Sequence, residues 1–162
     1  MWRQAIEWTA AWAYTTPVAE WIRSSSWAVP TLSVVHLIGL TLLLSSLFMI
    51  TLRCFGLAWR RDGAGAVVLA LAPATLGGLA LMTFSGSLLF AAGADRYVAS
   101  YSFEIKMVVY VVAVMVQSAV YVMAAREREH NRLVTPKWMV TGALVFLLWL
   151  GVAVSGRFIA FY

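Results

Sequence analysis

Residues 27–46 read WAVPTLSVVHLIGLTLLLSS, an almost unbroken apolar run that contains one ionisable side chain, His36. A helix needs about 20 mostly apolar residues to cross the hydrocarbon core of a bilayer, and this run is long enough. An imidazole inside it must find its partners within the protein, because lipid offers none. The stretch therefore predicts a membrane-spanning helix that carries a candidate functional residue.

The composition of the whole chain is typical of a membrane protein. Of its 162 residues, 62% are hydrophobic and 12% are charged, and the mean hydropathy is +0.84. Soluble domains carry about 25% charged residues, so this chain would expose too much apolar surface in water. The net charge is +5, but the basic residues lie mainly between apolar runs, which indicates topology signals and lipid contacts. We expect a lipid bilayer around the protein and no nucleic-acid partner.

Four apolar stretches are long enough to span a membrane, namely residues 28–52, 66–92, 103–125 and 138–160. The connections between them are short and charged, so consecutive helices should be antiparallel neighbours. The sequence predicts an all-α integral membrane domain over residues 28–162, an up-down bundle of four transmembrane helices.

The first 27 residues form a separate segment, in which tryptophans are mixed with charged side chains. Thr16 followed by Pro17 is typical of a helix N-cap with proline in the first turn, and Glu20 suits that end of a helix. Indole rings prefer the headgroup region, where charged neighbours reach water. Residues 1–27 are predicted to form short amphipathic helices in the membrane interface, and the alternative is a disordered tail.

Lysine and arginine are distributed unevenly between the two ends of the predicted bundle. Seven of them lie at the first and third connections, and five lie at the other end. Cytoplasmic segments are richer in these residues, so the first and third connections should face the cytoplasm and both termini should lie outside.

Polar residues of all four predicted spans lie at a similar depth, near the outer face of the membrane. His36 lies about six residues below the outer end of the first span, roughly 9 Å at 1.5 Å per residue. Ser85 lies in the outer third of the second span, Lys106 in the first turn of the third and Arg157 in the last turn of the fourth. These four residues are the candidate ligand-binding or cofactor-binding set, with His36 as the candidate metal ligand.

Helical spacing indicates that His36 and Lys106 face into the bundle, because small and polar residues share their faces. The inner halves of the spans offer little polar chemistry beyond Gln117 and Ser118. In the second span, small and polar residues predict tight helix packing and a slightly open interior at Gly77, Gly78, Met82, Ser85 and Gly86.

Each candidate also has a structural explanation. Lys106 and Arg157 lie close enough to an interface to extend their charges into water, and Ser85 can bond a carbonyl one turn back. His36 can be a hydrogen-bonded structural residue, although an ionisable group within a span is a functional candidate by default. The chain has one cysteine, Cys54, and no catalytic or metal-ligand motif, so we do not expect it to be an enzyme on its own.

Several short motifs, including HLIGLTLLLSS, LRCFGLA, FSGSLLF, YSFEIKM and SGRFIAFY, resemble an uncharacterised family of small bacterial four-span membrane proteins. The resemblance covers nearly the whole chain and implies a multi-pass protein of the bacterial inner membrane. The positions that match the family's recurring residues are His36, Ser85, Gly86, Lys106, Gly156 and Arg157. A histidine late in the third span is common in that family, whereas this chain has Tyr121 and Val122 there.

Two more distant likenesses concern function. Phe103, Lys106 and the histidine of the first span are similar to the copper-resistance D family of membrane proteins, and the architecture is similar to helical bundles that hold haem b. These likenesses imply haem b or copper as the ligand of a module in a membrane redox or metal-handling system, and the two cations expected beside His36 also suit a quinone headgroup.

The alternative is a non-catalytic accessory subunit that docks a membrane or periplasmic partner through its outer face and its Trp-rich segment. Association with further copies of the chain is also left open by the sequence.

Overall fold

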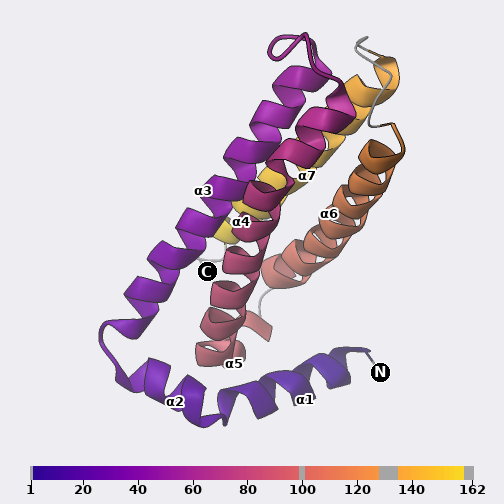
Figure 1. Ribbon diagram of the computed structural model, residues 1–162. Coiled ribbons are helices and arrows are strands. Elements are labelled where there is room, and N and C mark those ends of the chain that lie inside the picture. The colour runs from indigo at the N-terminus through magenta and orange to yellow at the C-terminus, as the bar shows by residue number, and fades with distance from the viewer. Residues whose placement is uncertain (1, 99–100, 128–134, 159–162) are drawn as a thin grey trace.

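The computed structural model describes residues 2–98, 101–127 and 135–158. These residues form helices and contain no strand, so the all-α prediction is confirmed. The four long helices make an up-down bundle, with α1 and α2 across one end of it (Figure 1). The helices are α1 (Trp2–Tyr14), α2 (Pro17–Ser24), α3 (Ala28–Cys54), α4 (Ala64–Ala92), α5 (Ala94–Val98), α6 (Tyr101–Arg126) and α7 (Pro136–Phe158).

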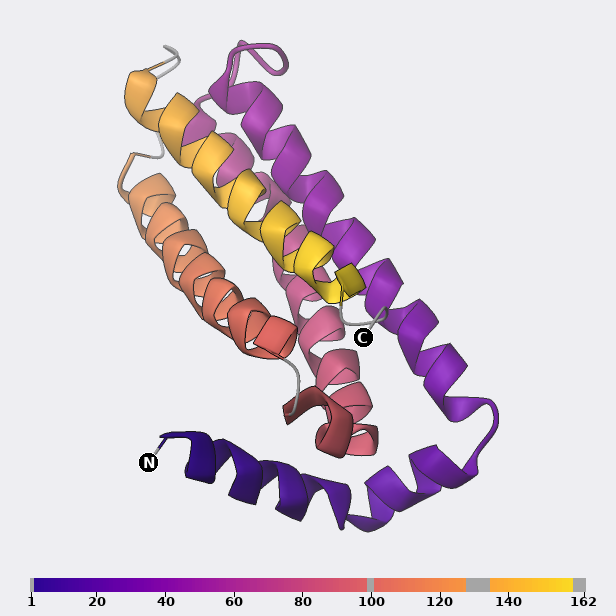
Figure 2. The same cartoon turned by 180° about the vertical axis from the view of Figure 1, so that it is seen from behind.

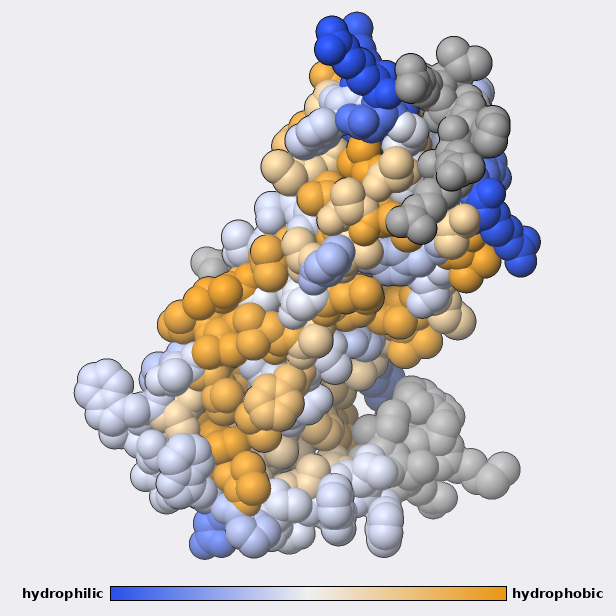
Figure 3. Space-filling model, viewed as in Figure 1, coloured by the Kyte–Doolittle hydropathy of each residue, from blue (hydrophilic) through white to orange (hydrophobic). Residues whose placement is uncertain are grey.

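Each long helix contains a segment that is apolar and long enough to cross a membrane. At most 28% of the residues in the most apolar part of each segment are buried, so the bundle presents apolar side chains on its outside. Figure 3 shows this surface as a hydrophobic belt between two more hydrophilic ends. Such a surface is stable in lipid and not in water, and the protein is a multi-pass membrane protein.

The observed helices extend slightly beyond most of the predicted spans. The first ends at Cys54 rather than at residue 52, and the second begins at Ala64 rather than at residue 66. Residues 159 and 160, the predicted end of the fourth span, lie outside the described residues.

Helices α3 and α4 approach each other closely through glycine. A Cβ atom added at Gly39 would lie 2.7 Å from the Met82 nitrogen, and one added at Gly78 would lie 2.7 Å from the Leu43 nitrogen. The two backbones can meet only because neither glycine has a side chain. The prediction for Gly77 is wrong, because a Cβ there would meet nothing within 4 Å.

Helix α7 is held to both of its neighbours near its start. The Glu127 carboxylate, just after α6, accepts hydrogen bonds from Lys137 Nζ at 2.6 Å and from Trp138 Nε1 at 2.9 Å. On the other side, Thr51 Oγ1 of α3 lies 3.2 Å from the Gly142 carbonyl oxygen. These polar contacts flank a core of buried apolar residues that includes Leu43 and Leu47.

Helices α1 and α2 lie below the bundle, at the end where α3 begins, and Figure 2 shows the same arrangement from behind. The predicted N-cap is confirmed, since the Thr16 hydroxyl accepts a hydrogen bond from the Ala19 amide at 3.3 Å. Ala19 and Ile22 of α2 are buried. The large exposed side chains of this segment include Trp8, Trp12, Val18, Trp21 and Trp27.

Candidate functional site

The imidazole of His36, which belongs to α3, lies against α4. His36 is half-buried, and its Nδ1 atom lies 3.2 Å from the hydroxyl oxygen of Ser85. Ser85 is fully buried on α4. The structure therefore brings together two of the four candidate residues. They lie on different helices and are 49 positions apart in the sequence.

The hydrogen bonds of Ser85 assign the proton on the His36 ring. The Ser85 hydroxyl lies 2.7 Å from the Leu81 carbonyl oxygen and 3.2 Å from that of Met82. A carbonyl only accepts, so the single hydroxyl proton of Ser85 donates to the backbone. Its oxygen is then left to accept, and Nδ1 of His36 is the donor. We therefore assign the proton of the neutral ring to Nδ1, which leaves a lone pair on Nε2.

Two glycines lie against the polar groups of this site. A Cβ atom added at Gly86 would lie 3.0 Å from His36 Cε1, and one added at Gly156 would lie 3.2 Å from Lys106 Nζ. The imidazole therefore packs on the backbone of α4, and the ammonium packs on the backbone of α7. Lys106 is also near enough to His36 to act on it electrostatically.

The four long helices all contribute to this level of the bundle. His36 comes from α3, Ser85 and Gly86 from α4, Lys106 from α6 and Gly156 from α7. We call this set of residues the histidine site. The backbone of Arg157 lies in the last turn of α7, next to Gly156, but its side chain lies outside the described part of the structure. A contact between Arg157 and the other three candidates stays a prediction.

Aromatic and hydroxyl contacts that were not predicted hold α6 beside α4. Phe90 and Phe103 stack with their ring centroids 5.2 Å apart, and Tyr97 of α5 stacks on both rings. One turn beyond Lys106, the Tyr110 hydroxyl lies 2.7 Å from that of Thr83. The only signal in the sequence was that Phe103, Lys106 and Tyr110 share one face of a helix.

The described residues contain no group of three or more histidine, cysteine, aspartate or glutamate side chains that could hold a metal ion. Within that part of the chain, His36 is the imidazole that could ligate a metal at this level. An ion that needs several protein ligands would have to recruit the others elsewhere, whereas haem supplies four nitrogen ligands of its own.

The fold and the histidine site define a class, namely small multi-pass helical membrane proteins with a histidine inside the bundle. Comparisons with protein-family models, with characterised proteins and with solved structures give no significant match. The function is accordingly inferred from the residues of this chain.

Proposed function

We propose that this protein is a small membrane module that binds a ligand or cofactor at the histidine site, within the outer leaflet. The observation that carries the proposal is the hydrogen bond between His36 Nδ1 and the buried Ser85 hydroxyl. Histidines that bind metals commonly donate their second ring N–H to a nearby oxygen, which orients the ring and its ligating nitrogen. With Nδ1 held by Ser85, Nε2 is the ring nitrogen available for a ligand.

The charges at the site favour a ligand that carries or develops negative charge. Lys106 brings an ammonium group to the level of His36, and Arg157 lies next to Gly156 in the chain. Haem b fits this pattern through its propionates, and a quinone fits it through carbonyl oxygens that accept hydrogen bonds. Copper fits less well, because it needs more soft or imidazole ligands than His36 alone supplies.

If haem binds, His36 would ligate its iron. A further ligand would come from a methionine, water, a small ligand or a neighbouring chain. In each case the protein would be one component of a membrane redox or metal-handling system rather than an enzyme on its own. The proposed location is the bacterial inner membrane, with the histidine site near its outer face.

A second candidate function is an accessory subunit that docks a membrane or periplasmic partner. The exposed tryptophans of α1 and α2 favour it, since Trp8 and Trp27 are 74% and 79% exposed. Aromatic residues of this kind are enriched both at protein interfaces and at membrane interfaces. On this interpretation the histidine site is structural, and the purified protein carries no ligand.

The two candidates are separated by comparing wild type, His36→Ala and His36→Gln after purification in mild detergent. The measurements are the visible absorption spectrum, elemental analysis for iron and copper, and extraction of quinones. The ligand proposal predicts a bound species in wild type that both variants lose while remaining folded. The structural interpretation predicts a colourless, metal-free and quinone-free wild type, with most of its stability retained in His36→Gln. His130→Gln, which removes the other histidine, is the matched control and should keep the bound species.

A further inference from the structure

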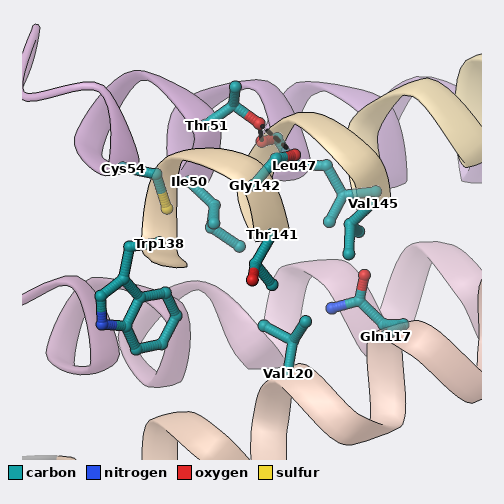
Figure 4. A pocket seen from close by; sticks show the side chains of 10 residues that line it. All are labelled: Leu47, Ile50, Thr51, Cys54, Gln117, Val120, Trp138, Thr141, Gly142 and Val145. Carbon is teal, nitrogen blue, oxygen red and sulfur yellow. Dashed lines mark hydrogen bonds between the residues drawn. The ribbon is translucent and has the colours of Figure 1, made fainter. Parts of the chain in front are cut away.

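A second polar site lies in the half of the bundle remote from His36. It is a small cavity between α3, α6 and α7, near Cys54 and Trp138 (Figure 4). The volume that the centre of a water molecule can occupy in it is about 10 Å³. That is close to the smallest cavity that can hold one water molecule.

Gln117 brings an unpaired amide to this cavity. The residue is 2% exposed, and neither its Oε1 nor its Nε2 atom has a hydrogen-bond partner within the described part of the chain. Figure 4 shows the amide pointing from α6 toward α7, into the space that the cavity occupies. A buried amide without partners is strongly unfavourable, so a partner of Gln117 is expected in the cavity.

The neighbouring tyrosine does not satisfy this amide. The Tyr121 hydroxyl is close to the Gln117 amide and to Thr75, but the distances and angles do not make a hydrogen bond to Tyr121. Thr75 donates its own proton to the Leu71 carbonyl oxygen at 2.9 Å. The polar side chains on this side therefore leave both amide atoms of Gln117 without a partner.

A threonine on the cavity wall can complete the site. The Thr141 hydroxyl donates to the Lys137 carbonyl oxygen at 2.7 Å, and Figure 4 shows it on the side of the cavity that faces Gln117. Its proton is thus engaged, while its oxygen lone pairs remain available as acceptors. The Thr51 hydroxyl lies instead against the carbonyl oxygens of Leu47 and Gly142, at 2.8 and 3.2 Å. A molecule between Thr141 and Gln117 must both accept and donate hydrogen bonds and must be no larger than water.

We propose that this cavity binds one ordered water molecule between Gln117 and Thr141. The water accepts a hydrogen bond from Gln117 Nε2 and donates to the hydroxyl oxygen of Thr141. It thereby joins α6 to α7 inside the bundle. The site is independent of any ligand at His36.

The chain contains two glutamines, Gln4 and Gln117, which allows a selective test. Full-length protein labelled with side-chain ¹⁵N-glutamine is placed in lipid nanodiscs, and Gln4→Glu assigns the remaining amide signal to Gln117. We expect cross-relaxation between the Gln117 amide protons and a proton at the water frequency. The signal should persist in Tyr121→Phe and disappear in Thr141→Val, and Thr51→Val is the matched control that should keep it.

The opposite pattern would overturn the proposal. A direct hydrogen bond between Gln117 and Tyr121 predicts no water signal in wild type and a shift of the amide protons in Tyr121→Phe. Loss of the water signal in Tyr121→Phe would show that it was relayed through the tyrosine hydroxyl, and its persistence in Thr141→Val would exclude the threonine. If Thr141→Val does not fold, the wild-type and Tyr121→Phe spectra still decide between water and tyrosine.

Discussion

At the scale of single residues, the position of the imidazole depends on the absence of a side chain at Gly86. A Cβ atom there would lie 3.0 Å from His36 Cε1, closer than carbon atoms ordinarily approach. The His36 ring is hydrogen-bonded to Ser85, which lies on the same helix as Gly86. The ring therefore cannot move away from Gly86 without straining that hydrogen bond.

We therefore predict that Gly86→Ala displaces His36 and weakens any ligand bound at its Nε2 atom by about tenfold or more, because ligation depends on sub-ångström placement. Global stability should change by less than about 1.5 kcal/mol, since only one flexible side chain has to adjust. Ligand content and the thermal midpoint of the purified variant measure the two effects. Ser87→Ala is the control, because the Ser87 hydroxyl bonds its own helix at Thr83. Unchanged ligand content in Gly86→Ala would contradict the proposed geometry.

At the scale of helices, the pair α3 and α4 depends on contact between the two backbones. We predict that Gly39→Ala and Gly78→Ala each destabilise the protein by about 1–3 kcal/mol, because the added carbon meets backbone atoms that cannot rotate aside. Reversible unfolding in mixed micelles measures the change. Gly77→Ala, one residue along the same helix, should cause no loss, since its Cβ would point into open space. Equal losses at Gly77 and Gly78 would contradict this packing.

The junction of α6 and α7 should be sensitive to acid. The hydrogen bond from Lys137 lowers the pKa of the Glu127 carboxyl below its ordinary range, and the hydrogen bond from Trp138 lowers this pKa to a smaller extent. A group whose pKa is lowered by folding stabilises the native state above its unfolded pKa and loses that effect as the pH falls through its folded pKa.

Acidification from about pH 7 to about pH 3 should therefore lower the thermal midpoint of wild type more than that of Glu127→Gln. The matched control is Glu20→Gln, an exposed carboxylate in α2. If Glu127→Gln and wild type lose stability in parallel over this range, the pair does not contribute to folding.

At the scale of the whole molecule, the uneven distribution of lysine and arginine predicts the orientation in the membrane. The test uses Ser26→Cys, at the end where α3 begins, and Asp62→Cys, in the connection between α3 and α4; both positions are exposed. A membrane-impermeant thiol reagent applied to intact cells should label position 26 and not position 62. Wild type, whose Cys54 is buried, is the unlabelled control. Labelling of position 62 and not of position 26 would show that the orientation is the reverse of the predicted one.

Much of the fold could be predicted from the sequence, because the length of an apolar run and a count of residues along it locate each span and the level of its polar groups. The rotation of α4 about its axis could not. The spans are apolar on all sides, so no hydrophobic stripe distinguishes Gly78, which is packed, from Gly77, which is not. The cavity beside Gln117 depends on how side-chain volumes fill the core, which a pattern of residue types does not specify.

In the proposed site, Ser85 holds His36 through Nδ1 and leaves Nε2 as the binding atom. This arrangement is tested by ¹⁵N NMR of the full-length protein labelled with ¹⁵N-histidine, with His130→Gln to assign the signals of His36. We predict a protonated Nδ1 and an unprotonated or ligated Nε2, and loss of the preference for this tautomer in Ser85→Ala. A ring protonated on Nε2 alone, with Nδ1 as the acceptor, would contradict this arrangement.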